Sequence, residues 1–148
     1  MSQRKNTEVG RFAKPDEIVG FWEMVPFAHP EAINSTNPWS LPHQSFAFYA
    51  DGIAASVHST AYRPRSAQSL KTVLDPIKDR SPRYGWKNGF LVITSREEGV
   101  ADEIWAVNIF LQQSVVRDDT FFPGDLLMSL EDGVSSKPVY YRHLRRLP

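Results

Sequence analysis

Apolar and polar residues alternate along most of this chain, which is the two-residue period of half-buried β-strands. Between residues 20 and 27 the alternation places Trp22 and Met24 on one face, which we expect to point inward, and Phe21 and Val25 on the other. The same period predicts a hairpin over residues 44–59, a second hairpin over residues 83–95, a long strand over residues 100–116, a strand within residues 124–133 and a last strand over residues 137–147.

Two dipeptides mark the predicted hairpin turns. Asp51-Gly52 and Asn88-Gly89 each separate two alternating segments, and such pairs favour tight turns because Asp, Asn and Gly tolerate positive φ. The pattern gives about eight short strands at regular spacing, which is typical of antiparallel all-β folds. This spacing argues for either a sandwich or a closed barrel, and closure would also remove exposed strand edges.

The hydrophobic period changes in one segment, residues 65–78. Four apolar residues fall at i, i+3, i+4 and i+7, namely Leu70, Val73, Leu74 and Ile77. This spacing predicts one short amphipathic helix between strands, which we expect to pack on the sheet or to plug one end of it.

Two segments lack a regular period. Residues 28–42 are rich in proline, with Asn and Ser between, and predict a long loop. Residues 1–14 are polar and aperiodic, so we expect a flexible N-terminal arm followed by a single domain over residues 15–148.

Composition narrows the function classes. The 148 residues carry 17 Lys and Arg against 17 Asp and Glu, so the chain lacks the positive field that nonspecific nucleic-acid binding uses, and we expect no nucleic-acid partner. Cysteine is absent, which rules out a disulfide framework. No apolar run approaches the ~18–20 residues of a membrane helix, and residues 1–14 lack the apolar segment of a signal peptide. We expect a cytoplasmic protein, or a periplasmic or secreted one if a signal peptide has been removed.

Five segments carry a resemblance to a known family. In order along residues 16–147 they are IVGFWEMV, FAFYADG, GFLVI, GDLLMSL and VYYRHLR, and this order resembles lipocalin-like proteins of the calycin group. In that group a G-x-W on the first strand packs against an Arg of the last strand at the closed end of an eight-stranded up-and-down barrel. The resemblance implies this role for Gly20 and Trp22 with Arg142, or less favourably Arg145. The resemblance therefore also implies an all-β, eight-stranded antiparallel up-and-down barrel here. The missing cysteines and the mid-chain helix favour a small bacterial-type lipocalin-like domain.

The predicted interior is the candidate ligand site. Strand parity assigns to it Met24, Phe46, Phe48, Trp86, Trp105, Val107, Leu126, Met128 and Tyr140. An eight-stranded barrel is wide enough either for packed side chains or for one small ligand, with Tyr140 or Asn108 as a polar contact. We expect non-enzymatic binding of a small hydrophobic or amphipathic molecule that enters at the end away from Trp22.

Two other functions stay open. A filled barrel could bind a protein partner through loop 28–42, where Trp39 is an aromatic of the type that anchors interfaces. A calycin-type isomerase or cyclase is a weaker alternative, in which a Tyr or His of the pocket would steer a reactive lipid.

No motif predicts a catalytic residue, cofactor or metal. The four histidines, His29, His43, His58 and His143, are scattered and are expected at the surface or rim. The neighbouring carboxylates Asp102-Glu103 and Asp118-Asp119 cannot easily form an acid/base pair, because adjacent strand residues point to opposite faces. We expect these carboxylates in turns or facing solvent. The chain has neither a G-x-S-x-G nucleophile elbow nor a phosphate-binding glycine loop.

Overall fold

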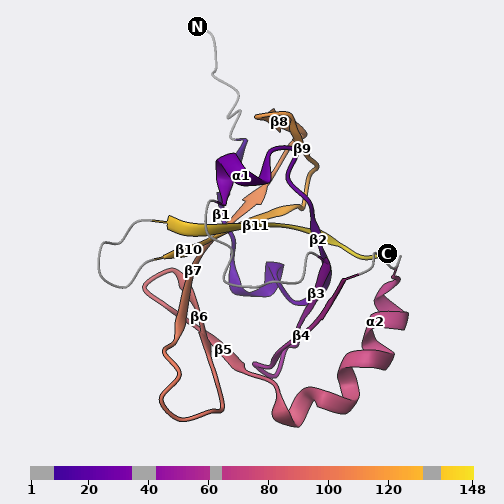
Figure 1. Ribbon diagram of the computed structural model, residues 1–148, viewed down its shortest axis with the longest axis vertical. Coiled ribbons are helices and arrows are strands. Elements are labelled where there is room, and N and C mark those ends of the chain that lie inside the picture. Colours follow the sequence, from indigo (N-terminus) through magenta and orange to yellow (C-terminus); the bar gives the residue numbers. More distant parts are fainter. Residues whose placement is uncertain (1–8, 35–42, 61–64, 132–137) are drawn as a thin grey trace, which may run out of the picture.

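The computed structural model describes residues 9–34, 43–60, 65–131 and 138–148. Over these residues, nine strands form one antiparallel sheet and two more form a separate hairpin (Figure 1). The strands are β1 (Gly10–Phe12), β2 (Gly20–Val25), β3 (His43–Phe48), β4 (Ala54–Ser59), β5 (Arg83–Lys87), β6 (Phe90–Thr94), β7 (Glu103–Phe110), β8 (Ser114–Val116), β9 (Asp119–Phe121), β10 (Leu126–Glu131) and β11 (Pro138–Arg146). The helices are α1 (Pro30–Ile33) and α2 (Ala67–Leu74), with 3₁₀ turns η1 (Pro15–Glu17) and η2 (Asp75–Arg80).

The main sheet is a meander that curls into a half-barrel. Its order is β4-β3-β2-β11-β10-β7-β6-β5, so the last strand lies beside the first long one. Between the end strands β4 and β5, the described residues form one isolated bridge, Ile53 with Arg83, in place of a continuous ladder. The predicted antiparallel β-fold is confirmed, whereas continuous closure into an eight-stranded barrel is absent from this strand pairing.

Part of the predicted N-terminal arm belongs to the sheet. Residues 10–12 form β1, which pairs with the end of β7. Gly10 permits this approach, because a Cβ there would lie 2.9 Å from the carbonyl oxygen of Ile109. Arg11 fixes the segment through an ion pair with Glu17 at 2.6 Å. The alternation rule misses a strand this short, and residues 1–8 lie outside the described part of the chain.

Both predicted hairpins are confirmed. β3 pairs with β4 and β5 with β6, and the turns fall at the two predicted dipeptides. Asn88 and Gly89 both have positive φ, at 54° and 84°, as a two-residue turn between twisted strands requires.

The long strand predicted over residues 100–116 ends early. β7 stops at Phe110 because its neighbour β10 begins at Leu126, which pairs with Ile109. The chain beyond it instead forms the β8–β9 hairpin, whose turn residues Arg117 and Asp118 both have positive φ.

The predicted helix is confirmed, and it packs on the sheet without plugging it. Leu70 and Leu74 of α2 are fully buried against Ala47, Ala55 and Leu147. These residues form a second core on the outer face of β2, β3 and β4, beside the C-terminus (Figure 1).

The predicted loop 28–42 contains one helical turn. Pro30 occupies the first position of α1, where its missing N–H costs no hydrogen bond. Residues 35–42, including Trp39, lie outside the described residues. Within the described part of the chain, no helix combines the length and apolar character that crossing a bilayer requires.

Candidate binding sites on the two faces of the sheet

The structure brings the nine predicted interior residues into one cluster on the concave face. Seven of them are buried, and Met24 and Trp86 pack against these as partly buried neighbours. Asn108 lies on the opposite parity of β7, in register with Leu127. Because aromatic and aliphatic side chains fill most of the concave side, little room is left there for an apolar ligand.

The arginine that covers Trp22 is Arg146, which corrects the predicted roles of Arg142 and Arg145. The Arg146 guanidinium lies 4.3 Å from the centre of the Trp22 ring and donates to the carbonyl oxygens of Val19 and Glu17, both at 2.8 Å. Strand register explains the difference, since Arg146 pairs directly with Trp22. Arg142 lies four residues earlier on the same face.

Gly20 lies against the same arginine, Arg146. Its φ is +143°, and a Cβ there would lie 2.2 Å from Nη1 of Arg146. The Trp22 indole N–H donates to the carbonyl oxygen of Ile18 at 2.8 Å. A side chain at residue 20 would therefore displace the arginine that covers the indole.

Arg142 instead lies inside the apolar cluster and is 3% exposed. Its guanidinium lies 4.4 Å from the ring centre of Phe46 and 4.7 Å from that of Trp105, which are favourable cation–π distances. Burial lowers the pKa of Arg142 to about 10, although the hydroxyl of Tyr140 and the carboxylate of Glu103 oppose the shift. The group therefore keeps its positive charge at neutral pH.

A small cavity of about 80 Å³ adjoins this buried charge. It is lined by Phe46 and Phe48 of β3, His58 of β4, Ile93 of β6, Glu103 of β7 and Arg142 of β11. Burial, and then the nearby charge of Arg142, lower the pKa of His58, which favours its neutral form. The cavity lies where β4 faces Pro82 and β6, beside the interruption of the strand ladder.

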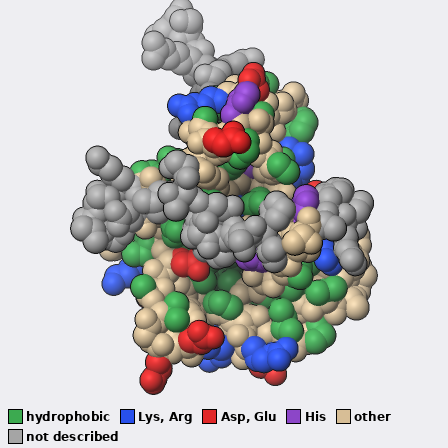
Figure 2. Space-filling model, in the orientation of Figure 1, with side chains coloured by type: hydrophobic (Ala, Val, Ile, Leu, Met, Phe, Trp, Pro, Cys, Tyr) green, Lys and Arg blue, Asp and Glu red, His purple; other side chains and the backbone are tan. Residues whose placement is uncertain are grey.

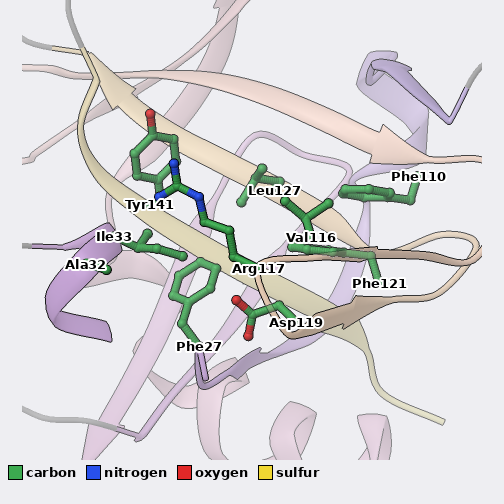
Figure 3. A pocket seen from close by; sticks show the side chains of 10 residues that line it. All are labelled: Phe27, Ala32, Ile33, Phe110, Val116, Arg117, Asp119, Phe121, Leu127 and Tyr141. Carbon is green, nitrogen blue, oxygen red and sulfur yellow. The ribbon is translucent and has the colours of Figure 1, made fainter. Parts of the chain in front are cut away.

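A larger pocket of about 350 Å³ lies on the opposite, convex face (Figure 3). Its walls are α1 and the β8–β9 hairpin, and its floor is the outer face of β10 and β11. The apolar lining consists of Phe27, Ala32, Ile33, Phe110, Val116, Phe121, Leu127 and the ring of Tyr141. Figure 2 shows charged and histidine side chains gathered on the surface of this end of the molecule.

One carboxylate enters the pocket, contrary to the expectation that Asp118 and Asp119 both face turns or solvent. Asp118 is exposed, but Asp119 is only 6% exposed. Oδ1 of Asp119 accepts a hydrogen bond from the backbone N–H of Ala28 at 2.7 Å, whereas Oδ2 is buried without a partner. The expectation was correct for Asp118, which lies in the turn before β9 with positive φ, and wrong for Asp119, which is the first residue of β9.

A buried ionic network holds the chain beside this pocket. Asp125 accepts hydrogen bonds from Nε2 of His143 at 2.7 Å, from Arg145 at 2.9 Å and from the backbone of Phe122 at 3.0 Å. Burial works to raise the pKa of Asp125, but these donors hold it below its usual value. The ring of Phe121 lies 4.1 Å from that of His143, which is 1% exposed and so is not the rim residue we expected.

The remaining histidines and carboxylates considered above form no metal site among the described residues. His29 pairs with Asp118 at the surface, and His43 lies at the start of β3. No three His, Asp or Glu side chains converge as metal ligands within the described ranges. Sequence reasoning missed His58, Glu103 and Asp119 as pocket residues. Strand parity could have placed His58 and Glu103 on the inner face of the sheet, because alternate residues of a strand share a face. No local signal in the sequence indicates that Asp119 is buried.

Comparison with protein-family models, curated proteins and solved structures gave no match for this chain.

Proposed function

We propose that this chain is a non-enzymatic, lipocalin-like binding protein whose curled sheet holds the acidic group of a small amphipathic molecule. The observation that carries the proposal is Arg142, a charged side chain buried at 3% exposure beside a cavity. Burying a charge is costly, and a buried charge that faces a cavity is a common ligand contact.

The strand order supports the lipocalin-like part of the proposal. β2 lies beside β11, and Gly20, Trp22 and an arginine of the last strand meet at one end. A continuous β4–β5 ladder would complete an eight-stranded barrel around the apolar cluster.

The size of the cavity limits the ligand. About 80 Å³ accommodates a carboxylate with a few carbon atoms, whereas sites for larger ligands typically measure about 300–1,000 Å³. The rest of a longer molecule would extend through the interruption between β4 and β5. Glu103 lies in the same cavity and weakens the positive potential, which favours modest affinity.

Hexanoate and its neutral analogue hexanamide are suitable probes. We expect saturable binding of hexanoate, followed by NMR shifts of the Phe46 and His58 rings, and at least about tenfold weaker binding of hexanamide. Arg142→Met should abolish the preference for the acid. Glu103→Gln, which removes the competing charge but keeps the acceptor for the Trp105 indole N–H, should tighten hexanoate binding. Unchanged hexanoate affinity in a folded Arg142→Met variant would contradict the proposal.

The interaction-module alternative depends on Trp39, which lies outside the described residues.

A further inference from the structure

The convex pocket is framed by side-chain contacts at both ends of α1. Before the helix, His29 donates to the carboxylate of Asp118 at 2.7 Å. After it, the Asn34 side chain donates to the carbonyl oxygen of Tyr141 at 2.9 Å and accepts from the Tyr141 N–H at 2.7 Å. The four-residue helix is thereby fixed across the outer face of the sheet, and the pocket beneath it is already open.

The body of the pocket suits a small ring or a short aliphatic group. Phe121 stacks on Phe110 at 4.2 Å between ring centres, with the planes 11° apart, which gives one flat wall. Phe27 and Ile33 face it from the side of α1 (Figure 3). The volume of about 350 Å³ falls within the range of sites that hold small molecules.

Asp119 gives this apolar space a charge preference. Its Oδ1 is satisfied by the backbone of Ala28, but its Oδ2 is buried with no donor within hydrogen-bond distance. An unpartnered buried carboxylate oxygen is costly, and a ligand that supplies an N–H removes that cost. A charged donor gives the larger gain, because hydrogen bonds between ions are about twice as strong as neutral ones.

Arg117 does not donate a hydrogen bond to Oδ2 of Asp119. It lies in the turn of the β8–β9 hairpin, its side chain is exposed, and it runs toward Tyr141 in Figure 3. Its charge is therefore at the solvated edge of the pocket, where water screens it, while the Asp119 oxygen is inside.

We propose that the convex pocket binds a small amine, with its apolar part between α1 and Phe121 and its ammonium group donating to Oδ2 of Asp119. This site is separate from the acid-binding cavity on the concave face, and nothing in its geometry depends on Arg142.

The test compares three probes of the same shape, 2-phenylethylamine, 2-phenylethanol and 3-phenylpropionate. Calorimetry should give saturable binding of the amine, at least about tenfold tighter than of the alcohol or the acid. Aromatic NMR signals of Phe27 and Phe121 should shift with the same affinity.

Asp119→Asn should lower amine affinity by at least about tenfold and leave the alcohol within about twofold. Asp102→Asn is the matched control, because it removes a carboxylate that is exposed and outside the pocket lining, and it should bind the amine as the parent does. Equal affinity for the three probes, an unchanged amine affinity in Asp119→Asn, or equal losses in the two variants would overturn the proposal.

A second variant covers the case in which Asp119→Asn fails to fold. Ala32 lines the pocket from the exposed side of α1, so Ala32→Trp can narrow the space without entering the core. It should weaken both the amine and the alcohol, and unchanged amine binding would contradict the assigned pocket.

Discussion

The concave and convex faces of one curled sheet differ in both space and charge. The concave face is almost filled, and its remaining cavity of about 80 Å³ adjoins the buried cation Arg142. The convex face keeps a pocket of about 350 Å³ beside the buried carboxylate Asp119. The tightly packed concave face therefore still contains a buried charge, Arg142. The larger of the two cavities lies on the convex face, outside the predicted barrel interior.

The difference follows from what covers each face. Strands of the curled sheet cover the concave side with their own aromatic side chains, which leave few voids. The convex side of β10 and β11 is covered by one helical turn and a short hairpin, which bridge the sheet without filling the space beneath them. The two buried charges have opposite sign, so we assign acids to the concave face and amines to the convex face.

The largest expected effect is a loss of stability when the Asp125 network beside the convex pocket is removed. Asp125→Ala removes the acceptor of both His143 and Arg145 and should lower the free energy of unfolding by about 3–5 kcal/mol, because it leaves the buried ring nitrogen of His143 without its partner and breaks the ion pair with the partly exposed Arg145. Urea denaturation of the variant and the parent measures the difference. A loss below about 1 kcal/mol would show that this network is solvated.

The two concave arginines should contribute differently to stability. Arg146→Met loses two hydrogen bonds to backbone carbonyls and the cover over Trp22, which should lower unfolding free energy by about 2 kcal/mol. Arg142→Met removes the cost of a buried charge together with its cation–π contacts to Phe46 and Trp105, and because these two effects offset each other we expect stability to change by less than about 1 kcal/mol. Thermal unfolding of the pair tests this contrast. A larger loss in Arg142→Met than in Arg146→Met would make Arg142 a structural residue.

A smaller effect concerns the pH dependence of stability through the ion pair of Arg11 and Glu17. The Arg11 guanidinium lowers the pKa of Glu17 from 4.5 to about 2, against the effect of burial. The folded state therefore releases the Glu17 proton more readily than the unfolded state does, so the pair stabilises the fold above pH 4.5 and this stabilisation is lost as the pH falls toward 2.

Because the ion pair is partly exposed, we expect about 1 kcal/mol. The stability difference between the parent and Glu17→Gln should be constant above pH 5 and vanish near pH 2. A difference that persists at the lowest pH would contradict the ionic origin.

The smallest expected effect is the pH dependence of hexanoate binding at the acid site. Burial and Arg142 hold the pKa of His58 below its usual value, and an acid bound beside Arg142 would raise it. Binding then takes up a proton, so hexanoate affinity should increase severalfold as the pH falls through the range in which His58 titrates. NMR titration of His58 with and without hexanoate measures the shift. An unchanged or lower pKa in the complex would place the acid elsewhere.

Local patterns predicted the elements that depend on neighbours in sequence. The turns at residues 51–52 and 88–89, the α2 face with Leu70 and Leu74, and the inward parity of Trp22 all follow from periods and turn residues. Each of these needs only the geometry of a strand or a helix.

Register and long-range contacts set the rest. Arg142 and Arg146 share one face of β11, and only the pairing of Trp22 with Arg146 decides which of them covers the indole. Asp119 is buried because residues 28 and 119 meet through a hydrogen bond that spans 91 positions. Neither fact leaves a trace in local composition, so the choice between the two arginines and the convex pocket were beyond sequence reasoning, whereas strand parity did place Phe46 and Phe48 at the concave cavity.

The two assigned sites can be tested together in one set of amide and aromatic NMR spectra recorded while hexanoate and 2-phenylethylamine are added to the same protein in turn. We expect two separate sets of shifted signals, around Phe46 and His58 for the acid and around Phe27 and Phe121 for the amine, with each ligand leaving the affinity of the other unchanged. A single shared set of signals, or competition between the two ligands, would contradict the assignment of opposite charges to opposite faces.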